Sequence, residues 1–197
     1  LNKLNNRFEK GLNAAIKRSR KSLMNSSFEI LGLIFNLLNY AFVFLLIFNL
    51  LKVNYFNPIV SVFVKVYKPI SKVLSILPIQ AINIFVIAVV LKLFSLIIYF
   101  GNQYETINLF GVAIIQTLMV TLRIIFFAVI GGVILSWVRP EKSNAFLELV
   151  EEISYKSLAP IRKYIPAAGG LDFSPLFILI LINLLESFLS DILRSIV

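Results

Sequence analysis

Four charged side chains lie deep within the long apolar runs of this sequence, and they are the residues whose types and spacing could do chemistry inside a membrane. They are two bases and two acids: Lys92, Arg123, Glu186 and Asp191. At 1.5 Å per helical residue, counted from Ile79, Val138 or Pro175, they lie about 20, 22, 16 and 24 Å deep, respectively. Ionisable groups at such depth usually pair, face the interior of a helix bundle or line a wet cavity. We therefore expect Arg123 and Lys92 to pair with Glu186 and Asp191.

These charges have three possible roles. The first is a structural clamp between three membrane spans, held by ion pairs. The second is a pathway for an ion or a proton. In the third, the long Lys and Arg side chains reach the far membrane interface without a partner.

The residues that the chain lacks exclude many other chemistries. Its 197 residues contain no Cys and no His, so it cannot carry a disulfide, a thiol nucleophile, a His-ligated metal or haem, or a His general base. Glu148, Glu151 and Glu152 form a charge run that is typical of a solvated helix face, and Glu152 with Lys156 makes a favourable i,i+4 pair. We expect no enzymatic activity, no cofactor and no bound metal.

Composition and charge indicate the solvent and the partners. Hydrophobic residues make up 59% of the chain, against about 45–50% in soluble domains, so lipid should surround most of it. The net charge of +9 could suggest nucleic acid, but Lys and Arg beside apolar spans typically set topology and contact anionic headgroups. The expected partners are the bilayer, anionic phospholipid headgroups, and a protein partner or a second copy of the chain, with no nucleic acid.

A second candidate site is the polar stretch before the last apolar run. It combines prolines, a basic pair, a glycine pair and a helix start: Pro160, Arg162, Lys163, Pro166, Gly169, Gly170, Asp172, Ser174 and Pro175. We expect the first two prolines to bracket a basic turn and the glycines to let the backbone reverse. Ser174 is the expected N-cap of the last helix, with Pro175 at its first position and Asp172 near its positive end. A capped linker before any membrane helix would explain the Ser-Pro pair equally well.

The whole string resembles the motif that ends the repeat of the YggT family, also called the YGGT or YlmG family, of bacterial and plastid membrane proteins. The resemblance implies a multi-pass protein with two YGGT repeats, in the bacterial cytoplasmic (inner) membrane rather than a plastid membrane. Plastid relatives are implicated in haem attachment and nucleoid placement, and bacterial relatives accompany cell-division genes, which implies a scaffold or assembly factor acting through this interaction turn. Others are associated with osmotic tolerance and potassium uptake, which implies oligomeric ion uptake or an osmotic-stress role as the alternative.

Four apolar runs must position these sites: residues 30–51, 80–100, 106–138 and 176–197. Each has about the 20 residues that a membrane crossing needs. The third is long enough to require tilt or a kink, which we expect at Gly131-Gly132. Ala128, Gly132 and Ser136 also form a small-residue stripe that another helix could approach closely.

The linkers inside each pair of spans are expected to be interfacial amphipathic helices. Asn57-Pro58 predicts the start of the first, whose apolar residues and lysines recur on opposite faces, and Pro69 should bend or break it. The pattern returns 87 residues later at Asn144. This indicates an internal duplication, with repeats at residues 24–102 and 103–197. The predicted fold is an all-α membrane protein with four transmembrane helices from two parallel repeats of a two-span unit.

Residues 1–23 are strongly basic and have three interpretations: an amphipathic surface helix, a targeting peptide, or an extension ahead of a native start at Met24. We favour the last, because Met24 to Ser27 resemble a start followed by a helix cap. Positive charge then concentrates in the two linkers, which predicts cytoplasmic linkers and outside termini. If residues 1–23 are counted, the orientation is undecided.

Overall fold

The chain folds into six helices in the computed structural model, which describes residues 2–74, 78–138, 140–165 and 172–196, without the side chains of residues 2–25 and 72–74. The helices are α1 (Asn2–Leu50), α2 (Pro58–Leu74), α3 (Gln80–Phe100), α4 (Thr106–Val138), α5 (Ala145–Arg162) and α6 (Ser174–Ile196). Four segments are long and apolar enough to cross a membrane: Ser26–Leu50 within α1, and the whole of α3, α4 and α6. The predicted all-α fold with four spans is confirmed, and the predicted bounds of α3 and α4 are those observed.

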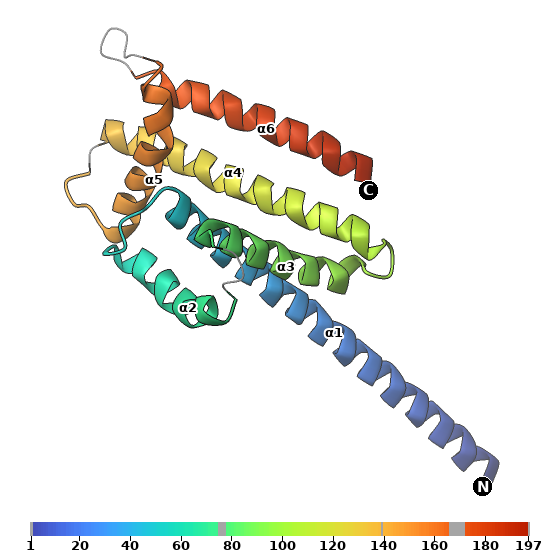
Figure 1. The fold of residues 1–197 in the computed structure, drawn as a ribbon. Coiled ribbons are helices and arrows are strands. Elements are labelled where there is room, and N and C mark those ends of the chain that lie inside the picture. Colours follow the sequence, from blue (N-terminus) through green and yellow to red (C-terminus); the bar gives the residue numbers. More distant parts are fainter. Residues whose placement is uncertain (1, 75–77, 139, 166–171, 197) are drawn as a thin grey trace.

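The spans pack side by side in the order α1, α3, α4 and α6. The two shorter helices, α2 and α5, gather at the same end of these long helices (Figure 1). The C-terminal ends of α1 and α4 and the N-terminal ends of α3 and α6 all lie at that end. The N-terminal part of α1 extends away from the other helices. Each half of the chain thus contains a long helix, a shorter helix and a second long helix, while the duplication itself stays a prediction.

The main core lies between α1, α2 and α3, and a polar residue sits within it. Side chains such as Val43, Ile47 and Ile84 are almost completely buried there. Asn39, on the same helix and also fully buried, donates from Nδ2 to the Ala88 carbonyl on α3 at 2.8 Å and to Thr117 Oγ1 on α4 at 3.3 Å. One amide therefore joins three spans in a region from which water is excluded.

Gly131 and Gly132 form a packing site, and α4 continues through both without a break. A Cβ at position 131 would lie 2.8 Å from Val150 Cγ1, and one at position 132 would overlap Oγ and Cβ of Ser154. Both neighbours belong to α5. The glycines allow the backbone of α4 to approach α5 closely, as the small-residue stripe indicated.

Two predicted helix boundaries are not observed. Helix α1 runs through Met24 to Ser27, where a helix cap was expected, because residues 12–31 contain no Gly or Pro to stop it. Helix α2 continues through Pro69 without a break. Lys65, whose carbonyl loses its helical hydrogen-bond donor, is exposed and can be hydrated. The predicted cap at Asn57 is confirmed, since its Oδ1 accepts from Ile59 N at 3.0 Å.

The close contact between α4 and α5 predicts that Gly132→Ala destabilises the protein by about 1–3 kcal/mol, the usual cost of overpacking. Unfolding in detergent, followed by circular dichroism, measures the change. Gly111→Ala is the matched control in the same helix, because a Cβ there meets only the end of the Ile196 side chain, at 3.3 Å. Equal stability of the two variants would contradict the packing role of Gly132.

Candidate functional site

The linkers of the two halves are joined by hydrogen bonds between residues far apart in the sequence. Asn57 Nδ2 donates to the Ala145 carbonyl at 2.7 Å, and the backbone N–H of Asn54 donates to Glu152 Oε1 at 2.9 Å. Lys156 forms an ion pair with Glu152 at 2.7 Å and also donates to the Lys52 carbonyl. We call α2, α5 and the loops that precede them the linker platform.

The sequence did not reveal this junction. Glu152 and Lys156 are the i,i+4 pair that was predicted, but they also bind backbone groups of the other linker. The available signal was the pair of asparagines that begin the two amphipathic helices. Asn144 caps α5 by accepting from Phe146 N and Leu147 N, as Asn57 caps α2. Only Asn57 uses its amide nitrogen to reach the other linker.

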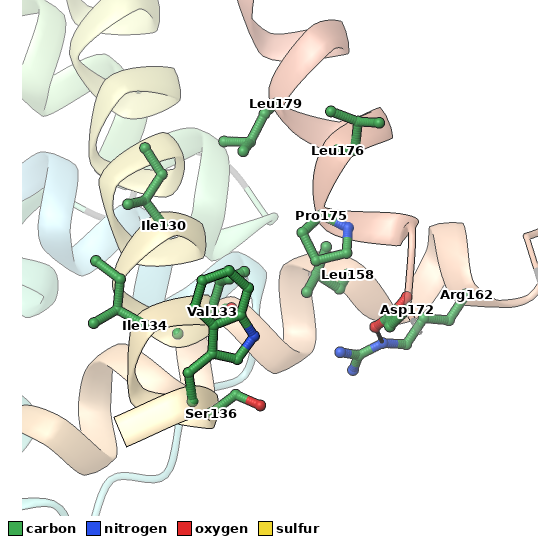
Figure 2. A pocket seen from close by; sticks show the side chains of 13 residues that line it. Ile130, Val133, Ile134, Ser136, Leu158, Arg162, Asp172, Pro175, Leu176 and Leu179 are labelled. Atoms are coloured by element: carbon green, nitrogen blue, oxygen red, sulfur yellow. Dashed lines mark hydrogen bonds and ion pairs between the residues drawn. The ribbon is translucent and has the colours of Figure 1, made fainter. Parts of the chain in front are cut away.

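Beside the platform lies a cavity of about 520 Å³ between the end of α4, α5 and the start of α6 (Figure 2). Its wall is mainly aliphatic, with Ile130, Val133 and Leu179 among the lining residues. Polar groups come from Ser136, Ser154, Arg162 and Asp172. The cavity has the apolar wall and small number of polar groups that characterise binding sites.

An ion pair joins the end of α5 to the start of α6 at one side of the cavity. Arg162 Nε lies 2.9 Å from Asp172 Oδ2, as Figure 2 shows. The guanidinium carbon also lies 5.2 Å from the centre of the Tyr155 ring, within cation–π range. These contacts fix the position of Arg162, one of the residues predicted for the interaction turn.

Two details of the predicted turn differ from the structure. Pro160 does not bracket a turn but lies in the last helical turn of α5, which ends at Arg162 with Lys163 as its C-cap residue. Ser174 is not the N-cap, because α6 already begins at Ser174 with Pro175 as its second residue. The Asp172 carboxylate instead accepts from Ser174 N at 2.9 Å. Pro166, Gly169 and Gly170 lie outside the described residues.

The surroundings of Asp172 favour its charged form. Partial burial tends to raise the pKa of the carboxyl, but the hydrogen bonds that it accepts from the Ser174 backbone N–H and the Arg162 guanidinium outweigh this effect. The pKa of Asp172 is therefore held below its usual value. The carboxylate is ionised at neutral pH, where it both caps α6 and pairs with α5.

The four charges within the apolar runs do not form one cluster. Arg123 Nε lies 3.6 Å from Glu186 Oε1, which is one of the expected pairings. Lys92 pairs with no acid, because its Nζ faces α1 and donates to Asn36 Oδ1 at 2.9 Å. Asp191 lies near the end of α6 and contacts Arg194, three residues on, at 3.5 Å.

The prediction that Lys92 and Asp191 form ion pairs between spans is thus wrong. Counting residues along a helix gives the depth of a side chain but not the neighbour toward which it points. Within the described residues, no group of three His, Cys, Asp or Glu side chains could hold a metal ion. The arrangement offers binding surfaces and buried hydrogen bonds.

Comparisons with known proteins cover the part of the chain that builds this cavity. A family model described as CCB3/YggT matches residues 111–193. The protein named YggT of Escherichia coli (strain K12) is 26% identical over 151 residues, covering 72% of this chain and 77% of that protein. The matched region, residues 111–193, is of the YggT type. With four apolar spans, the chain is a multi-pass membrane protein.

Two further relatives extend the comparison. An uncharacterized protein of Haemophilus influenzae is 28% identical over 147 residues, covering 72% of this chain and 79% of that protein. An uncharacterized protein of Pseudomonas aeruginosa is 42% identical over 74 residues, but these are only 38% of each chain. No solved structure matches the chain.

The low pKa of Asp172 predicts a pH-dependent contribution to stability. A carboxyl whose pKa is lower in the folded than in the unfolded chain stabilises the fold above its unfolded pKa, near 3.8. That contribution is lost as the pH falls through the folded pKa. We expect Asp172→Asn to destabilise the protein by about 0.5–1 kcal/mol at pH 7, the range of exposed ion pairs, and to have little effect at the acid end.

Thermal unfolding in detergent between pH 3 and pH 7 measures this difference. Asp191→Asn is the control, because it removes a more exposed ion pair that lies within a single helix. An Asp172→Asn effect that stays constant over the whole range would contradict the ion-pair and capping role.

Proposed function

We propose that this YggT-type protein is a non-enzymatic scaffold or assembly factor of the bacterial inner membrane, acting through the linker platform. The observation that carries the proposal is the joining of α2 and α5 by Asn54, Asn57, Glu152 and Lys156. Hydrogen bonds that hold two amphipathic helices together at one end of the spans create a single preorganised surface. Such a surface binds with less ordering cost than two independent linkers would.

The charge of the platform supports an anionic partner. The inner side of α2 packs on α1 through buried Val60 and Tyr67, while Lys65 and Lys68 are exposed. At the end of α5, Lys163 is also exposed. With the basic residues 1–23 left out of the count, the positive-inside rule places this end in the cytoplasm, where anionic phospholipid headgroups and an acidic protein surface are the fitting partners.

Photo-crosslinking in living cells tests the scaffold proposal. A photoreactive residue at Val66 or Phe146, which are 58% and 61% exposed on the platform, should join the protein to one defined cytoplasmic or membrane partner. Ile107 is the matched control, because it is 69% exposed and lies at the start of α4, away from the platform. Equal products from both ends, or none from the platform, would reject the proposal.

One observation favours ion uptake as a second candidate function. Polar groups lie one after another between α1, α3 and α4: Asn36 accepts from Lys92, Asn39 contacts Thr117, and Ser95 Oγ donates to the Gly32 carbonyl at 2.9 Å. A line of buried and part-buried polar groups within spans is the kind of feature that marks ion or proton pathways.

Flux measurements distinguish the two candidates. We expect purified protein in liposomes to carry no potassium or proton flux, and Lys92→Met, Arg123→Met and Glu186→Gln to alter stability alone. Each variant is compared with the unsubstituted protein at equal incorporation and matched helical content. Flux that folded variants lose would replace the scaffold proposal with ion uptake.

A further inference from the structure

Helix α6 carries a polar face that the rest of the described chain covers only in part. Its members recur at steps of three and four residues, which places them on one side of the helix: Asn183, Glu186, Ser187, Ser190, Asp191 and Arg194. The buried residues of α6 are Ser174, Ile178 and Ile182, all in its first half. From Asn183 to Ile196 the span has no buried residue, and it lies at the edge of the row of spans (Figure 1).

Arg123 of α4 extends this polar face into the middle of the membrane. Its side chain is 59% exposed although Glu186 is its ion-pair partner. Arg123 lies 15 residues from the end of α4 and Glu186 lies 12 residues from the start of α6. At 1.5 Å per residue, both are about 20 Å from the platform end of a hydrocarbon layer about 30 Å thick. Hydrocarbon cannot solvate a guanidinium, so an exposed one at this depth calls for a covering surface with polar groups.

The Arg123–Glu186 ion pair within one chain does not use all the hydrogen-bonding groups of these two residues. The Arg123–Glu186 distance of 3.6 Å is longer than a charge-assisted hydrogen bond of about 2.7–2.9 Å. Glu186 Oε1 is buried and accepts no hydrogen bond within the described chain. A buried carboxylate oxygen without a donor is costly, and a guanidinium has five N–H groups to share.

We infer that the polar face of α6, together with Arg123, is the interface through which two copies of this chain pair side by side in the membrane. The charges of the surface are self-complementary: Arg123 and Glu186 in the middle, Asp191 and Arg194 toward the end. A two-fold axis along the membrane normal preserves depth. Arg123 of one copy therefore meets the second copy at the level of Glu186, which places two bases and two acids together.

A second copy fits this surface better than the other possible occupants. Lipid tails provide no hydrogen-bond donors or acceptors, so they would leave the exposed guanidinium of Arg123 incompletely satisfied. A surface of a single charge sign would satisfy one of the two residues and repel the other. The chain's own surface carries both signs at the same depth. The inference is independent of the scaffold proposal, since the platform lies at the end of the spans and this face lies along them.

Single introduced cysteines test the interface without background, because the chain contains no Cys. Asn183→Cys and Ser187→Cys place one thiol on the polar face. Leu181→Cys and Phe188→Cys are matched controls on the exposed apolar side of the same helix, where the native residues are 48% and 63% exposed. Mild oxidation in native membranes forms a disulfide only where the Cα atoms of two copies come within about 7 Å.

We expect a cross-linked dimer from at least one polar-face position, at a yield at least fivefold above both controls. Equal yields on the two sides, no dimer from either polar-face position, or a disulfide to a different protein would overturn the inference. These variants leave Arg123 and Glu186 in place, so the result does not depend on the folding of charge variants.

Charge reversal adds a readout that an ion pair within one copy would not produce. One tagged copy carries Arg123→Glu, and a second copy with a different tag carries Glu186→Arg. The two variants are expressed together and singly, and co-purification after detergent extraction measures pairing. One copy then has two acids and the other two bases, so we expect the mixed pair to form at least fivefold more than either pair of identical variants. No preference for the mixed pair would show that these residues act only within one chain.

Discussion

The amide of Asn39 is placed where neither water nor lipid can satisfy it, and the arrangement of the spans follows from that constraint. Its two hydrogen bonds reach the Ala88 carbonyl and the Thr117 hydroxyl, so α1, α3 and α4 are held in one relative rotation and depth. Hydrogen bonds of this kind between membrane helices contribute about 1–2 kcal/mol in model peptides. Apolar packing alone is less selective, because lipid tails are as apolar as Leu and Ile side chains. One polar residue therefore supplies specificity that the apolar contacts around it do not.

Helix α4 then connects this three-span core to the remaining elements. Near its end, Gly131 and Gly132 admit Val150 and Ser154 of α5, and its other side carries Arg123 against α6. The contact with α5 places the linker platform and the adjoining cavity, and Asp172 connects α5 to α6 through Arg162. Rotation of α4 would change all of these contacts together. The candidate site is therefore built on the packing of a membrane span, although its residues come largely from linkers.

The sequence predicted the features that depend on local chemistry, and it was less reliable where the answer depended on a neighbour. Apolar length gave the bounds of α3 and α4, and the Asn-Pro pair gave the start of α2. The depth argument correctly paired Arg123 with Glu186. It also predicted an acidic partner for Lys92, but Lys92 donates a hydrogen bond to Asn36 of α1. At Gly131 and Gly132 the sequence offered both a kink and a close contact, and the close contact could be assigned to a neighbour only once α5 was placed. The Asn54–Glu152 junction left no sequence pattern, since a backbone N–H is the donor.

The linker platform has a consequence for the biogenesis of the protein. Its hydrogen bonds join residues separated by 88, 98 and 104 positions in the chain. A ribosome makes the chain from its N-terminus, so Asn54 and Asn57 emerge long before Ala145 and Glu152 are translated. During that interval α2 has no α5 to bind, and its apolar side has only α1, α3 and the lipid surface. The finished platform thus marks chains whose second half has been translated and inserted, and a partner that recognises α2 and α5 together would ignore nascent ones.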